Sequence, residues 1–197
     1  DEESDGMSMT LVEFKRRHSA SSGIVSLCSL VAIGCYLAML LELPAAGWRG
    51  FGIIVAIVFP LLLGVTTIIQ ARFVAPVLVY LRVRQTGTAD AKQVRRAYCS
   101  LSYLALRTWL AGMSWWSVAG LVVATAMELY LDAFSRYGFL IVVLASTSGG
   151  FVASTFHYYV CKWLYRDLRQ ELAQQIGSGD ERRRLSYRLS LRHKLVT

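Results

Sequence analysis

The chain has 197 residues, of which 55% are hydrophobic and only 17% are charged, and its formal net charge is +8. The mean hydropathy is +0.44, and the charged fraction lies below the roughly 25% of a typical soluble domain. The apolar residues gather into long uncharged blocks, which argues against a water-soluble domain and favours an integral membrane protein.

Residues 1–18 precede the first apolar block and are acidic at first and then basic. The opening residues, DEESDGMSMT, offer little apolar surface to bury, so this lead is predicted to be disordered. Its second part carries Lys15, Arg16 and Arg17 among a few apolar side chains. We expect that part to lie along the membrane surface before the first helix enters the bilayer.

Four uncharged blocks follow, and each is long enough for an α-helix to cross about 30 Å of hydrocarbon. Lipid offers the backbone no hydrogen-bond partners, so a spanning segment is expected to be helical. The predicted spans, three of which reach slightly beyond the uncharged block, are residues 19–43, 50–73, 108–129 and 137–161. The predicted fold class is therefore an all-α integral membrane protein with four transmembrane helices.

Basic residues predict the orientation of these helices. They cluster before the first block, between the second and third, and after the fourth, whereas the other two loops hold only Arg49 and Arg136. The positive-inside rule then places both chain ends on the cytosolic side. Because orientation explains the positive charge, no nucleic-acid partner is predicted.

Residues 74–107, between the second and third spans, are predicted to form a cytosolic helical loop. Apolar residues interleaved with arginines continue the second helix beyond the membrane, and the sequence QTGTAD then breaks it. Asp90 is suited to the N-cap of a further helix that leads into the third span.

The fourth block carries two rows of small residues at a spacing of four. Such rows let helix backbones approach closely, so this helix is predicted to be the central packed one, inside the bundle or at a dimer seam. The residues of this predicted packing interface are Ala145, Ser146, Gly149, Gly150, Ala153 and Ser154.

His157 lies near the cytosolic end of the same block. An ionisable residue within a membrane helix is a functional candidate, and the alternative is a hydrogen-bonded histidine at the interface. The sequence contains no GxxxxGK[ST], GxGxxG, HExxH, GxSxG or CxxC motif, and its four cysteines lack metal-ligand spacing. No catalytic residue, metal or cofactor is therefore predicted, and whether the parent protein is an enzyme stays open.

After Cys161 the fourth helix is predicted to continue, so that residues 137–172 form one helix. Tyr165, Leu168 and Leu172 occupy heptad-like positions. This pattern favours a short parallel coiled coil in a dimer, and we interpret it as an output helix.

Residues 162–197 form a basic tail whose last stretch has an apolar stripe. A basic amphipathic helix is expected on the anionic inner leaflet, and the alternative is a lead into a further membrane helix. The residues predicted to face the membrane surface are Arg182, Arg183, Arg184, Arg188, Arg192 and Lys194.

Three stretches carry a resemblance to a known family: APVLVYLRVR, LSYLALRTWLAGMSWW and GGFVASTFHYYVCKWLYRDL. The region 76–168 resembles the N-terminal membrane domain of bacterial class III adenylate/guanylate cyclases that have several membrane helices before a HAMP linker. Some histidine kinases carry similar domains. The resemblance implies a multi-pass protein of the bacterial cytoplasmic (inner) membrane, a dimer, and a parent protein that is a nucleotide cyclase.

Two functions remain open at this point. The first is a membrane sensor or anchor module that passes a signal from the fourth helix to a cytosolic output domain not present in this chain. The second is a non-catalytic integral subunit that scaffolds a larger membrane complex. A channel or transporter is disfavoured, because no polar pathway and no internal repeat is visible in the sequence.

Overall fold

A computed structural model describes residues 9–130, 134–176 and 179. These described residues form five helices: α1 (Leu11–Leu40), α2 (Ala45–Thr86), α3 (Ala91–Tyr130), α4 (Arg136–Leu164) and α5 (Arg166–Gln175). The described residues form no β-strand. Helices α1 to α4 are each long and apolar enough to cross a membrane, as in a multi-pass membrane protein. The all-helical class and the four candidate spans are therefore confirmed.

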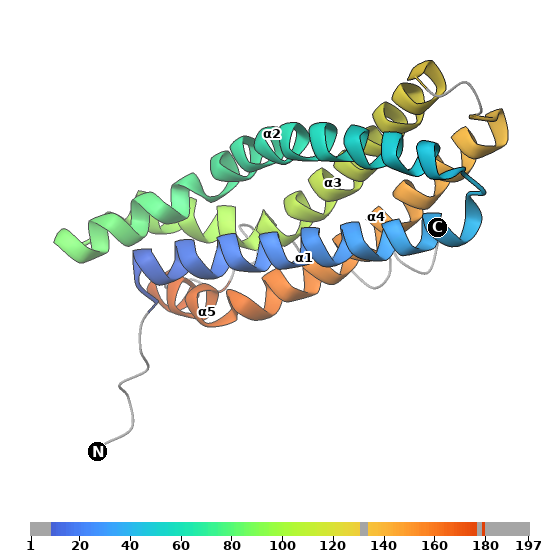
Figure 1. The fold of residues 1–197 in the computed structure, drawn as a ribbon. Coiled ribbons are helices and arrows are strands. Elements are labelled where there is room, and N and C mark those ends of the chain that lie inside the picture. Colours follow the sequence, from blue (N-terminus) through green and yellow to red (C-terminus); the bar gives the residue numbers. More distant parts are fainter. Residues whose placement is uncertain (1–8, 131–133, 177–178, 180–197) are drawn as a thin grey trace.

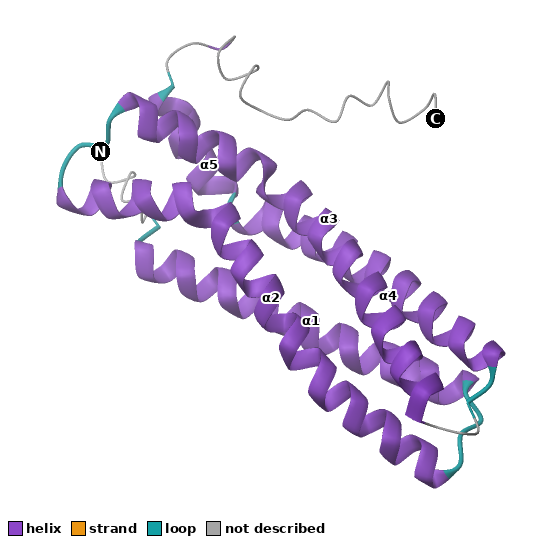
Figure 2. Cartoon of the chain, turned by 90° about the horizontal axis from the view of Figure 1, so that it is seen from above, coloured by secondary structure: helices purple, strands orange, loops and turns teal. Residues whose placement is uncertain are grey.

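The axes of the four long helices are roughly aligned, and consecutive helices run in opposite directions (Figures 1 and 2). The connections α1–α2 and α3–α4 lie at one end of the bundle, and the α2–α3 turn and α5 lie at the other. This second end holds most of the arginines and lysines, and we call it the basic end. Helix α4 packs against both α3 and α1, and α3 also packs against α2, whereas α1 and α2 touch only slightly.

Local side-chain bonds explain where two of these helices begin. Thr10 Oγ1 accepts a hydrogen bond of 3.2 Å from the Glu13 N–H at the start of α1. Ser135 Oγ accepts one of 3.0 Å from the Gly138 N–H at the start of α4. Each bond satisfies a backbone donor that has no partner within its helix.

Helices α2 and α3 are longer than a membrane requires. They have 42 and 40 residues, which at 1.5 Å per residue is about 60 Å, roughly twice the hydrocarbon thickness. Their ends at the basic end form a hairpin, and α3 begins directly after Asp90, whose N–H donates to Gln93 Oε1 at 3.1 Å. The predicted helical loop between the second and third spans is thus two continuous helix extensions.

The buried apolar side chains form two separate clusters along the bundle. The basic-end core joins the start of α1, the α2–α3 hairpin, the end of α4 and α5; among its members are Phe14, Tyr80, Leu104, Tyr165, Leu168 and Leu172. The far-end core joins α1, α3 and α4; among its members are Ile33, Leu37, Trp116, Ala124, Met127 and Val142. Helix α5 contributes only to the basic-end core.

The predicted disordered lead is wrong for residues 11–18, which form the first two turns of α1. The reason is Phe14, which is 0% exposed in the basic-end core and gives this turn an apolar contact. Arg17 also pairs with Glu13 along the helix, as residues four apart do. Residues 1–8 lie outside the described part of the chain.

The prediction of one helix over residues 137–172 is also wrong. Helix α4 ends at Leu164, Tyr165 has φ −107° and ψ 15°, and α5 begins at Arg166. The physical reason is that Tyr165, Leu168 and Leu172 are buried in the basic-end core of their own chain. The stripe that suggested a coiled coil therefore faces α3 and its neighbours within one chain. The tail residues Arg182 to Lys194 lie outside the described residues.

Candidate functional site

The two small-residue rows of α4 lie inside the bundle and separate α3 from α1. A Cβ on Gly150 would lie 2.2 Å from Trp116 Cβ of α3, and one on Gly149 would lie 2.5 Å from Ile33 Cγ1 of α1. These distances leave no room for a side chain. All six predicted interface residues are buried or half-buried: Ala145, Ser146, Gly149, Gly150, Ala153 and Ser154.

A small polar pocket lies between the two cores, where α1 to α4 all meet. Its volume is about 40 Å³, and its wall includes Thr108 of α3 together with Ser154 and His157 of α4. On the other side, Ser22 of α1 donates a hydrogen bond of 3.1 Å to Gln70 Oε1 of α2. The pocket is thus lined by hydroxyl, amide and imidazole groups in an otherwise apolar bundle.

The turn between α4 and α5 is tied to α1 by a buried aromatic contact. His18 Nδ1 and the Tyr165 hydroxyl share a hydrogen bond of 2.8 Å. The Tyr165 ring also lies 4.9 Å from the Phe14 ring, centroid to centroid. Burial raises the pKa of Tyr165 above its usual range. A movement of α1 would therefore act directly on the turn.

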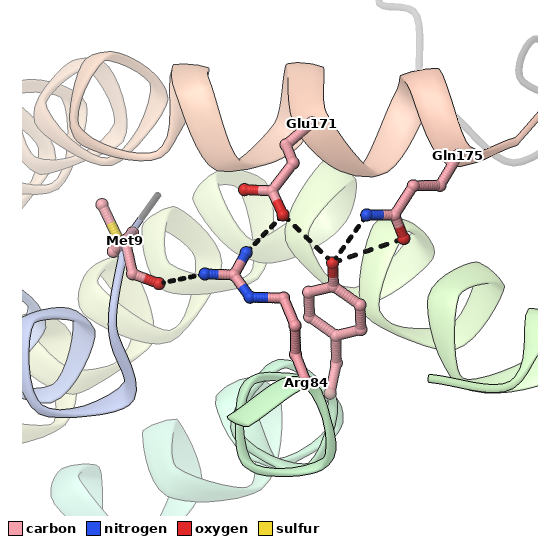
Figure 3. A network of polar contacts seen from close by, with 5 residues as sticks. Met9, Arg84, Glu171 and Gln175 are labelled. Carbon is pink, nitrogen blue, oxygen red and sulfur yellow. Dashed lines mark hydrogen bonds and ion pairs between the residues drawn. The ribbon is translucent and has the colours of Figure 1, made fainter. Parts of the chain in front are cut away.

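A polar network holds α5 on the hairpin, and we call it the latch (Figure 3). Arg84 of α2 pairs with Glu171 of α5, and its other terminal nitrogen donates to the Met9 carbonyl at 2.9 Å. The Tyr80 hydroxyl donates to Glu171 Oε1 at 3.2 Å and accepts from Gln175 Nε2 at 3.0 Å. The latch joins the segment before α1, α2 and α5, and its ion pair of Arg84 and Glu171 stays partly exposed, whereas Tyr80 is buried.

Breaking the latch is expected to loosen α5 while the bundle stays folded. In a double-mutant cycle of Arg84→Gln and Glu171→Gln, we expect a coupling energy of about 1 kcal/mol, since the pair is charged but partly solvated. The readout is the free energy of opening for the amides of residues 166–175, from hydrogen exchange in lipid nanodiscs. A coupling energy near zero would show that the pair does not hold α5.

The sequence indicated some of these residues and missed others. His157 was predicted and lies in the pocket wall, whereas Thr108 carried no signal beyond a hydroxyl within an apolar block. The latch residues were missed, although Tyr80 and Arg84, like Glu171 and Gln175, are polar pairs four apart, which place both members on one helix face. No group of three or more His, Cys, Asp or Glu side chains that could hold a metal ion occurs in the part of the chain that the structure describes.

No protein-family model, no curated protein and no solved structure matches this chain. A functional assignment therefore depends on the geometry of the pocket, the turn and the latch.

Proposed function

We propose that this chain is a membrane sensor or anchor module of a signalling protein. In this proposal a change in the packing of α4 passes through the turn at Tyr165 to α5, and from α5 to a cytosolic output domain. The observation that carries it is the docking of α5: the helix that follows α4 is held at the basic end by a latch whose ion pair, Arg84 with Glu171, is partly exposed. Such a contact is weak enough to open and close.

The proposal includes an orientation with the basic end in the cytosol. The arginines and lysines of the hairpin and of the α4–α5 region support it through the positive-inside rule. The basic tail would then contact the anionic inner leaflet of a bacterial cytoplasmic membrane. The resemblance to membrane domains of class III cyclases supports a homodimer and a nucleotide cyclase as the parent protein.

A fusion experiment tests the signalling role. The chain is joined after Thr197 to a nucleotide cyclase catalytic domain and expressed in a bacterium without its own cyclase. Glu171→Ala is expected to change cyclic nucleotide formation by up to about five-fold at equal amounts of membrane-inserted protein, because about 1 kcal/mol changes the equilibrium constant between docked and undocked α5 by about that factor. The direction depends on which position of α5 activates the output.

The matched control is Arg82→Ala, which removes an exposed arginine two residues from Arg84 and outside the latch. Its cyclic nucleotide output is expected to equal that of the unmodified fusion. Equal output from the Glu171→Ala fusion would contradict the proposal.

A scaffold subunit is the second candidate, and one observation favours it. A groove of about 540 Å³ lies between α1 and α4, open toward the outside of the bundle and lined mainly by apolar side chains such as Ile24, Val152 and Phe156. A helix of another membrane protein could pack there. Co-purification of a stoichiometric partner that is lost with Val152→Trp would favour this function over signalling.

A further inference from the structure

The polar pocket contains three buried atoms that need a partner. Thr108 Oγ1, Ser154 Oγ and His157 Nε2 have no hydrogen-bond partner among the described residues. Their residues are only 1%, 4% and 7% exposed. A buried polar atom without a partner costs free energy comparable to a lost hydrogen bond, so three of them around one pocket indicate an occupant.

The residues that line the pocket limit which kind of molecule can occupy it. The lining residues include no Asp, Glu, Lys or Arg, so a bound ion would have no permanent counter-charge. The two hydroxyls can both donate and accept, and the imidazole nitrogen can do either according to its tautomer. An occupant that donates and accepts hydrogen bonds without a net charge fits all three groups.

The size of the pocket points to a very small molecule. The pocket has a volume of about 40 Å³, whereas one buried water needs at least roughly 10–15 Å³. The pocket thus has room for about two or three waters. The Ser22–Gln70 pair offers further polar atoms on the opposite wall of the pocket.

We propose that this pocket is an internal water site in which ordered water bridges Thr108, Ser154 and His157 across the α3–α4 interface. The water satisfies the three buried groups and joins the two helices between their apolar cores. Among the described residues, His18 Nε2, one helical turn from Ser22 toward the basic end, is a further buried atom without a hydrogen-bond partner. The water site does not depend on the signalling proposal.

Replacing Thr108 with valine tests the inference, because the side chain keeps its shape and loses only the hydroxyl. If water occupies the pocket, the variant loses a hydrogen bond, and the Tm of the detergent-solubilised full chain should fall by about 2–4 °C. The control is Thr66→Val, also in the pocket wall: the Thr66 hydroxyl donates at 3.1 Å to the Leu62 carbonyl of its own helix, which keeps its backbone N–H partner in the variant, so no buried group loses its partner. Its Tm is expected to stay unchanged.

An unchanged or higher Tm for Thr108→Val would overturn the inference, because removing an unpaired hydroxyl from a dry pocket costs nothing or stabilises the fold. A structure determined at a resolution that shows water gives a second measurement. We expect density within hydrogen-bond distance of Thr108 Oγ1 and Ser154 Oγ. An empty pocket, or a peak with the anomalous scattering of a bound ion, would also overturn the inference.

Discussion

Replacing Gly150 with leucine is expected to destabilise the bundle by about 3 kcal/mol or more, the upper range for forcing extra methylene groups into a packed core. Already a Cβ at this position would lie 2.2 Å from Trp116 Cβ. Trp116 cannot withdraw easily, because it belongs to the far-end core and is itself buried. The separation of α3 and α4 would have to increase, and contacts along both helices would be lost. The measurement is the thermal stability of the detergent-solubilised chain, and the readout is the fraction that stays monodisperse.

Gly64→Leu provides the matched control. Gly64 lies within α2, and a Cβ there would meet nothing within 4 Å. The same substitution should therefore leave stability unchanged or raise it slightly, since leucine favours a helix over glycine. Gly149→Leu should resemble Gly150→Leu, because Ile33 of α1 occupies the space beside it. Equal stability of the Gly150 and Gly64 variants would show that α4 does not pack as described.

The sequence predicted the position of this interface but could not identify its partner. Spacing alone shows that small residues line one side of α4, because every fourth residue faces the same way. Whether α3, α1 or a second chain fills that side depends on how the helices cross. The structure places Trp116 and Ile33 there. Nothing in the sequence distinguishes either residue from the other apolar residues of the membrane helices.

Replacing Leu172 with alanine is expected to undock α5 without unfolding the membrane bundle. Leu172 is 0% exposed in the basic-end core, and such a truncation costs about 2–5 kcal/mol. Helix α5 has only 10 residues, so it is too short to stay helical without its packing contacts. The backbone at Arg166 and Arg169 would then leave its helical conformation and become a substrate for trypsin, and the rate of cleavage at these residues in nanodiscs is the measurement.

The same variant separates docking within the chain from a coiled coil between chains. If Leu172 belonged to a dimer seam, its removal should lower the mass of the complex measured by light scattering. We expect the mass to stay the same while trypsin cleavage accelerates. Val79→Ala, at a half-exposed position of the same hairpin, is the control and should change neither quantity. A fall in mass without faster cleavage would contradict the docking of α5.

The turn at Tyr165 shows why one continuous helix over residues 137–172 was predicted incorrectly. Residues 165, 168 and 172 form an apolar stripe, and the stripe has the same period whether it packs on its own chain or on a partner. No proline or glycine marks the turn. The cause lies in the hairpin of α2 and α3, whose buried side chains, Tyr80 and Leu104 among them, offer a nearer apolar surface.

The four spans, by contrast, were predictable because lipid imposes a length and a composition on each helix. The long extensions of α2 and α3 were predictable from their mixture of apolar and basic residues. The pocket and the latch were not, because each joins residues from at least two helices. Arg84 and Glu171 are 87 positions apart, and only the folded hairpin brings them together.

The distance between α5 and α2 tests most directly whether packing within the membrane controls α5. Spin labels at the exposed positions Gln85 and Gln170, in a chain whose native cysteines are replaced by serine, report this distance by pulsed electron paramagnetic resonance in nanodiscs. The perturbation is Gly112→Ala, whose Cβ would lie 2.4 Å from Ser154 Oγ of α4, with Gly64→Ala as its control. We expect one narrow distribution for the unperturbed chain and for the control, and a shifted or broadened one for Gly112→Ala. Three identical distributions would contradict the coupling of α4 to α5.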